Sequence, residues 1–160
     1  MAPLVGSGDR VLVGKVAAEQ VRFGDIVVFR RKGDLIVHRV FRKHRTANGL
    51  RFSEKGDTRF AFAPVGGEQI VGRVTMVEKR GRMLSLTSPL SRFTNLALSA
   101  WLYWTAAGIT MLRSSRSKTI RRVGKVLSGL SLLSSKILVR ICFAIWYPSG
   151  LLARENREPN

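Results

Sequence analysis

The first 88 residues are divided by turn residues into short runs that are rich in Val, Ile and Phe, as is typical of β-strands. These runs cover residues 11–13, 25–30, 35–41, 50–53 and 69–77. The connecting segments, at residues 6–9, 32–34, 47–49 and 65–67, carry the residues of hairpin-like turns. Asp9 and Asp25 each follow a glycine and are expected to bond local backbone amides. Long helices do not alternate with the runs, which argues against a Rossmann-type or P-loop fold. The sequence therefore predicts a mainly β, mostly antiparallel domain over residues 1–88.

The character of the chain changes after Pro89. Residues 93–112 carry no charge and are long enough to span a bilayer. Polar residues dilute this run, so an amphipathic or buried helix is the alternative. A second apolar stretch, residues 126–147, is interrupted by Lys136 and Arg140, which favours a helix at the membrane interface over a span. We therefore expect a basic, apolar, membrane-associated helical region over residues 89–153 and a disordered tail over 154–160.

The charge of the chain is strongly positive. The 28 Lys and Arg residues against 10 Asp and Glu give a formal net charge of +18. Residues 1–90 carry 17 basic and 8 acidic groups (+9), and residues 91–160 carry 11 and 2 (+9), so the second part is almost purely cationic. Positive clusters beside apolar runs are typical of cytoplasmic loops or of contact with anionic headgroups. This pattern predicts anionic membrane lipid as a partner.

Three short segments are more specific than the composition. Residues 1–13 read Met-Ala-Pro-Leu-Val-Gly-Ser-Gly-Asp-Arg-Val-Leu-Val. Residues 23–29 read Phe-Gly-Asp-Ile-Val-Val-Phe and lead through a turn to Ile-Val-His-Arg-Val at residues 36–40. Residues 52–57 read Phe-Ser-Glu-Lys-Gly-Asp and precede Ile-Val-Gly-Arg-Val at residues 70–74. A lone Gly-Asp pair would carry no weight, whereas these five stretches in a fixed order are a specific pattern.

In their order and spacing, these segments resemble the boxes of type I signal peptidases, the membrane-bound serine endopeptidases that remove leader sequences from exported proteins. The family pattern is Ser-Met-x-Pro with a following Gly-Asp, then Gly-Asp-Ile-Val, a strand with the catalytic base, Lys-Gly-Asp and Gly-Arg-Val. The resemblance covers residues 1–78 and implies a signal-peptidase-like (LexA-like) β domain. Common bacterial members have a lysine base, whereas the archaeal and endoplasmic-reticulum type has a histidine. His38 at this position implies the histidine-base subfamily and a Ser-His-Asp mechanism.

His38 and Asp57 are the candidate catalytic residues. A serine hydroxyl is a weak nucleophile at neutral pH, so a base must take its proton and pass it to the leaving amine. A carboxylate that accepts from the other ring nitrogen fixes the tautomer of such an imidazole. The resemblance assigns these two roles to His38 and Asp57. After Asp57 no second acidic residue occurs before Glu68, so the carboxylate role depends on Asp57 alone. Outside this pattern, His38 would be a packed strand residue and Asp57 a turn residue.

The nucleophile of the family directly precedes the methionine of its first box, which is Met1 here. The serine, part of the oxyanion hole and the N-terminal anchor of the family would therefore precede the printed sequence. Ser7 lies six positions after Met1 and is no substitute. As printed, the chain is not expected to hydrolyse peptide bonds by the family mechanism. Two explanations compete: the natural chain starts upstream, or the protein is a non-catalytic relative that binds peptides or membranes.

The resemblance also implies the substrate and the location. The substrate would be an extended preprotein segment with small side chains before the cut, bound by β-augmentation near Met1, Pro3 and Leu4. The basic C-terminal part would hold the enzyme against anionic lipid, with the catalytic domain on the extracytoplasmic side. No metal or cofactor is implied, because two histidines and one cysteine at unrelated spacings make no ligand set.

Two rival functions belong to other classes. A self-cleaving repressor-type peptidase shares the implied β fold, but it uses a lysine base and a DNA-binding partner domain, whereas this chain has His38 and no helix-turn-helix pattern. A nucleic-acid-binding module would explain the charge through phosphate neutralisation. The cationic part, however, interleaves its charges with apolar runs and contains no RNA- or DNA-binding motif, so no specific nucleic acid is expected.

Overall fold

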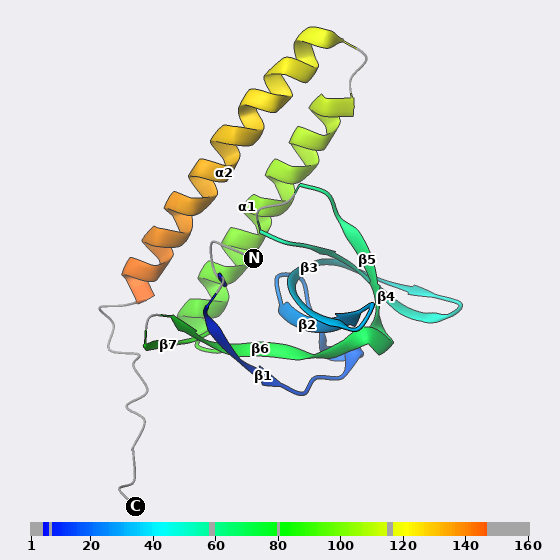
Figure 1. The fold of residues 1–160 in the computed structure, drawn as a ribbon, viewed down its shortest axis with the longest axis vertical. Helices are drawn as coiled ribbons and strands as arrows, with labels where there is room; N and C mark the ends of the chain where they lie inside the picture. Colours follow the sequence, from blue (N-terminus) through cyan, green and yellow to red (C-terminus); the bar gives the residue numbers. More distant parts are fainter. Residues whose placement is uncertain (1–4, 7, 58–59, 80, 115–116, 147–160) are drawn as a thin grey trace, which may run out of the picture.

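The computed structural model describes residues 5–6, 8–57, 60–79, 81–114 and 117–146. Its strands form a curled, fully antiparallel seven-stranded sheet, and a helical hairpin follows (Figure 1). The strands are β1 (Arg10–Gly14), β2 (Ile26–Arg31), β3 (Asp34–Thr46), β4 (Gly49–Lys55), β5 (Ala63–Gly66), β6 (Ile70–Lys79) and β7 (Arg82–Ser85). Two short 3-10 turns, η1 (Ala18–Gln20) and η2 (Gly67–Gln69), and the helices α1 (Pro89–Ser114) and α2 (Lys118–Trp146) complete the elements. The strand order is β1-β6-β2-β3-β4-β5, and β7 pairs with β6.

The predicted mainly β, antiparallel domain is confirmed, and so are its five predicted strands. Strands β5 and β7, each four residues long, are not predicted by the runs. Residues 65–67 were predicted as a connection, but β5 includes Val65 and Gly66. Strand β5 contains a proline, Pro64. It is tolerated because β5 is at the edge of the sheet, where one side of the strand needs no partner.

The turn carboxylates behave as predicted. Asp9 Oδ2 accepts a hydrogen bond from the Gly6 amide at 2.7 Å, and Asp25 Oδ2 accepts one from the Arg22 amide at 2.9 Å. These short-range bonds shape the turns before β1 and β2.

From His38 to Phe41, successive residues of β3 face opposite sides of the sheet, and both sides are buried. Val40 belongs to an apolar cluster inside the curl of the sheet, with Phe29 of β2 and Phe52 of β4. The next residue, Phe41, packs on the other side against Leu98 and Leu102 of α1. Because side chains alternate along a strand, neighbouring residues of β3 and β4 enter different environments. This alternation determines the composition of the candidate site.

Helix α1 packs against the turn before β2, at Gly24 in the Phe-Gly-Asp-Ile-Val-Val-Phe segment. Gly24 has a φ of +86°, a conformation that side chains rarely adopt, and a Cβ there would lie 2.9 Å from Ser99 Oγ of α1. Glycine at this position therefore permits both the turn and the close approach of the helix. Tyr103 of α1 adds an aromatic contact, with its ring centroid 6.3 Å from that of Phe41.

The two apolar stretches of the C-terminal part form α1 and α2, which pack along each other as a hairpin (Figure 1). Strand β7 ends at Ser85 and α1 begins at Pro89, so the elements change type where the composition does. In the described part of the chain, neither helix combines the length and the hydropathy of a membrane span. The predicted tail, residues 154–160, lies outside the described residues.

Candidate active site

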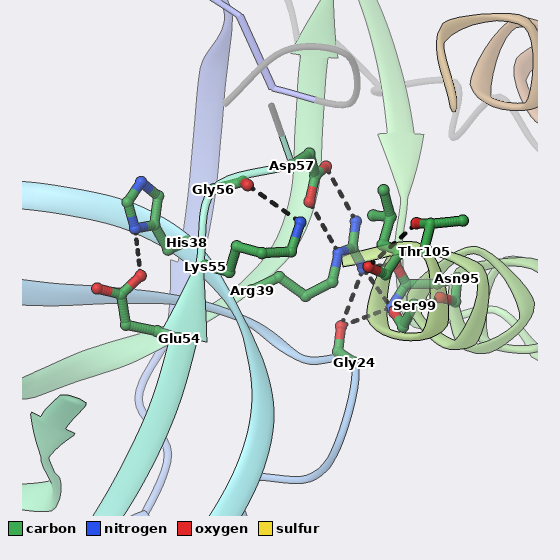
Figure 2. A network of polar contacts seen from close by, with 11 residues as sticks. Gly24, His38, Arg39, Glu54, Lys55, Gly56, Asp57, Asn95, Ser99 and Thr105 are labelled. Atoms are coloured by element: carbon green, nitrogen blue, oxygen red, sulfur yellow. Dashed lines mark hydrogen bonds and ion pairs between the residues drawn. The ribbon is translucent and has the colours of Figure 1, made fainter. Parts of the chain in front are cut away.

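His38 of β3 is held by a buried carboxylate. Its Nδ1 is hydrogen-bonded to Oε2 of Glu54 in β4 (Figure 2). The side chain of His38 is 19% exposed and that of Glu54 only 1%. Because an ionised carboxylate only accepts hydrogen bonds, Nδ1 is the protonated nitrogen in the neutral ring, and Nε2 is left as the proton acceptor. This tautomer is assigned from the bonding partner.

Arg31 of β2 balances the charge of Glu54. Its Nη2 lies 3.0 Å from Glu54 Oε1 and donates a hydrogen bond to the Pro64 carbonyl at 2.8 Å. The Arg31–Glu54 contact has ion-pair distance without hydrogen-bond alignment, so Oε1 has no hydrogen-bond partner among the described residues. Phe29 completes this environment, with Arg31 above its ring at 5.0 Å and His38 against its edge at 6.0 Å. The carboxylate is thus buried but not an isolated charge.

The free nitrogen of His38 faces the backbone at Gly56. A Cβ added to Gly56 would lie 3.0 Å from Nε2, closer than nine in ten ordinary Cβ contacts. Glycine in the Lys-Gly-Asp box therefore leaves room beside the accepting nitrogen. In the described residues no serine hydroxyl is hydrogen-bonded to this ring.

Asp57 has a different partner. The buried guanidinium of Arg39 donates to both of its carboxylate oxygens, from Nε to Oδ1 at 3.0 Å and from Nη2 to Oδ2 at 3.3 Å. Arg39 Nη1 also donates to the Gly24 carbonyl at 3.1 Å, to Ser99 Oγ at 3.0 Å and to Asn95 Oδ1. In Figure 2 this network lies at a different place from the His38–Glu54 contact, which is also drawn. Arg39 thus joins the end of β4, the turn before β2 and helix α1.

The predicted pairing of Asp57 with His38 is therefore not the one in the structure, and strand register explains why. Arg39 is opposite Lys55 and Val40 is opposite Glu54. Continuing this register by one residue places His38 opposite Gly56. Glu54 then lies on the same face as His38, two residues from the opposing position, whereas Asp57 lies on the face of Arg39. Because side chains alternate along the strand, Glu54 contacts His38 and Asp57 contacts Arg39.

Three side chains of the candidate site are not predicted from the sequence: Glu54, Arg39 and Lys55. Glu54 lies two residues before Gly56 of the Lys-Gly-Asp box. Residues two apart in a strand lie on the same face, and this spacing was the available signal. Arg39 follows His38 directly and carried no signal of burial, because arginines are rarely fully buried without a partner.

Lys55 lies buried between the two networks. Its Nζ donates to the Gly56 carbonyl at 3.3 Å and lies 5.3 Å from the centroid of the Phe41 ring. Burial lowers the pKa of Lys55 from 10.5 to about 8; the Asp57 carboxylate opposes this shift, and the Arg39 charge adds to it. This lysine therefore changes charge within an accessible pH range.

The lowered pKa of Lys55 predicts a pH-dependent stability. Between pH 8 and 10.5 the unfolded chain binds a proton at Lys55 that the folded chain has lost, so the free energy of unfolding rises with pH. Over this range the gain is on the order of 3 kcal/mol, since one pKa unit corresponds to about 1.4 kcal/mol. Urea unfolding of the parent protein and of Lys55→Met at pH 7, 9 and 10 measures it. Subtracting the free energy of unfolding of Lys55→Met from that of the parent cancels the contributions of the other titrating groups. Parallel pH profiles of the two proteins would contradict the prediction.

The predicted substrate-binding residues Met1, Pro3 and Leu4 lie outside the described residues. In the part of the chain that the structure describes, no three His, Cys, Asp or Glu residues are grouped so that they could hold a metal ion. The described arrangement is that of an imidazole with a fixed tautomer and a free acceptor nitrogen, which can move a proton to and from a neighbouring hydroxyl.

Comparisons with protein-family models, with curated proteins and with solved structures give no match.

Proposed function

We propose that the chain is the base-bearing part of a signal-peptidase-like serine endopeptidase, in which His38 is the general base and Glu54 its orienting carboxylate. The observation that carries the proposal is the hydrogen bond from His38 Nδ1 to the buried Glu54, which leaves Nε2 free. The boxes that resemble those of type I signal peptidases supply the reaction class. The antiparallel sheet with a β3 histidine is compatible with the implied LexA-like domain.

The reaction needs a serine, which the resemblance places directly before Met1. In the first step, the serine Oγ attacks the scissile carbonyl carbon while His38 Nε2 takes the Oγ proton. The carbon–nitrogen bond then breaks, and Nε2 gives that proton to the leaving amine. Water next attacks the acyl-enzyme ester, His38 takes its proton, and the proton returns to the serine oxygen. Through both halves, the role of Glu54 is to hold the ring and stabilise the imidazolium.

The test compares two proteins that differ by one atom. Both carry the residues encoded directly upstream of Met1, which supply the missing part of the oxyanion hole, and the residue directly before Met1 is serine in one protein and alanine in the other. The probe is a peptide with alanine at the first and third positions before the bond, the pattern of leader-peptide cleavage sites. We expect cleavage by the serine protein, none by the alanine protein, and none after His38→Ala in the serine protein. Mass spectrometry of the products locates the cut.

A folded serine protein that leaves the peptide intact would overturn the enzyme proposal. The alternative is then a non-catalytic relative that binds peptides or membranes. The codon directly upstream of that for Met1 provides a second check, because the proposal requires serine there.

We also propose that the helical hairpin holds the protein at an anionic membrane surface, on the extracytoplasmic side. Residues 89–146 contain nine Lys and Arg and no acidic residue. Large apolar side chains are nonetheless exposed on both helices, including Phe93 (69%) and Trp104 (72%) on α1 and Leu130 (57%) and Leu133 (56%) on α2. Apolar side chains interleaved with cations are typical of helices that lie in a bilayer interface.

Co-sedimentation with phosphatidylglycerol and phosphatidylcholine vesicles tests the surface role. We expect binding to the anionic vesicles, weakened about tenfold or more by Leu130→Ser with Leu133→Ser, because a buried leucine contributes roughly 1.5–3 kcal/mol. Leu35→Ser, at a leucine that is 62% exposed on the sheet, is the control and should leave binding unchanged. Equal binding by all proteins, or none by the parent, would refute the proposed surface.

A further inference from the structure

A cavity of about 310 Å³ lies between the turn before β2, strand β6 and the first turns of α1. Its apolar wall includes Ile26, Val74 and Leu86, which are buried. This volume is at the lower end of the range for small-molecule sites. The cavity is separate from the His38–Glu54 pair, and the proposed peptidase chemistry does not use it.

Three arginines from distant parts of the sequence line this cavity: Arg22 before β2, Arg73 on β6 and Arg92 on α1. The only acidic residue among its lining residues, Asp25, lies 3.4 Å from Arg73 and also accepts the Arg22 amide. The side chains of Arg22 and Arg92 have no hydrogen bond or ion pair within the described part of the chain. The cavity thus has two guanidinium groups without a protein partner.

The end of α1 at this cavity does not offset the positive charges of Arg22 and Arg92. Arg92 is in the first turn of α1, which contains no acidic residue. A positive side chain there is opposed by the helix dipole, which favours an anion at this end. Both unpaired side chains are exposed, so water and salt screen their attraction for an anion, and the preference for phosphate depends on their convergence on one cavity. A group with several acceptor oxygens could be shared by more than one arginine, because the planar guanidinium matches phosphate geometry.

We propose that this cavity binds a phosphate group, free or as the phosphodiester of a small headgroup. The arginines contact its oxygens, and the apolar wall accommodates a short organic substituent. Asn95 connects the site to the rest of the protein, since it lines the cavity, donates to the Gly24 carbonyl at 3.0 Å and accepts from Arg39.

Calorimetric titration at constant ionic strength tests the site with two probes, inorganic phosphate and dihexanoyl phosphatidylglycerol below its micelle concentration. We expect saturable binding that Arg22→Gln and Arg92→Gln each weaken about tenfold, as for the loss of one charge-assisted hydrogen bond. Arg122→Gln is the control. Arg122 is an exposed arginine near the start of α2, and that start lies at the end of the hairpin remote from the sheet (Figure 1).

The two probes identify the source of the phosphate. Binding of inorganic phosphate as tight as that of the lipid indicates a soluble phosphate ligand, and tighter lipid binding indicates a headgroup. Either result supports the site when the two cavity variants, and not Arg122→Gln, weaken it. Absence of saturation with both probes, or equal weakening by Arg122→Gln, overturns the inference. The readout is binding, so its failure leaves the peptidase proposal unaffected.

Discussion

Replacing Arg39 by methionine is expected to lower the free energy of unfolding by about 4 kcal/mol, because removal of one partner of a buried ion pair costs roughly 3–5 kcal/mol. The substitution leaves Asp57 buried without its cation and removes the bonds to Gly24, Asn95 and Ser99. Since domains are stable by only about 5–15 kcal/mol, a large share of the total is lost. Urea unfolding at pH 7 measures the change.

Arg30→Met, at an exposed arginine of β2, is the matched control and is expected to change stability by less than about 0.5 kcal/mol. A double variant, Arg39→Met with Asp57→Leu, removes both charges and should recover part of the loss, because apolar replacement of a buried pair is often tolerated. A loss in Arg39→Met no larger than in Arg30→Met would show that the network does not fasten α1 to the sheet.

In the protein with serine before Met1, Glu54→Gln is expected to lower kcat by about 10⁴-fold, the loss known for a triad whose carboxylate becomes an amide. The amide can donate to Nδ1, which would leave the proton of the neutral ring on Nε2 and block its action as a base. Steady-state cleavage of the alanine-containing peptide measures kcat, and circular dichroism checks that the variant is folded.

Glu78→Gln applies the same chemical change at a glutamate on the outer part of β6, where Glu78 pairs with Arg10 at 3.8 Å. Its kcat should equal that of the parent. Asp57→Asn separates the two candidate carboxylates. If Asp57→Asn abolishes cleavage in folded protein while Glu54→Gln does not, then the carboxylate implied by the family resemblance is the catalytic one and Glu54 is structural.

Much of the fold could be predicted from residues 1–88 because its signals are local. Runs of β-branched and aromatic residues between glycine-containing turns predicted five strands, and the turn roles of Asp9 and Asp25 followed from their neighbours. The strands that were missed, β5 and β7, are too short for a clear run, and β5 contains Pro64. The two apolar C-terminal stretches likewise predicted helices, because length and composition are local properties.

The sequence by itself determined His38 as a candidate base, the separation of a β part from a helical part and the excess of positive charge. Only the tertiary structure decided which carboxylate contacts His38. That contact depends on the register of β3 against β4 and on the buried Arg39, which forms an ion pair with Asp57. The tertiary structure also decided that Arg22, Arg73 and Arg92 share one cavity. Pairing across strands and helices joins residues that are distant along the chain, and no local pattern specifies it.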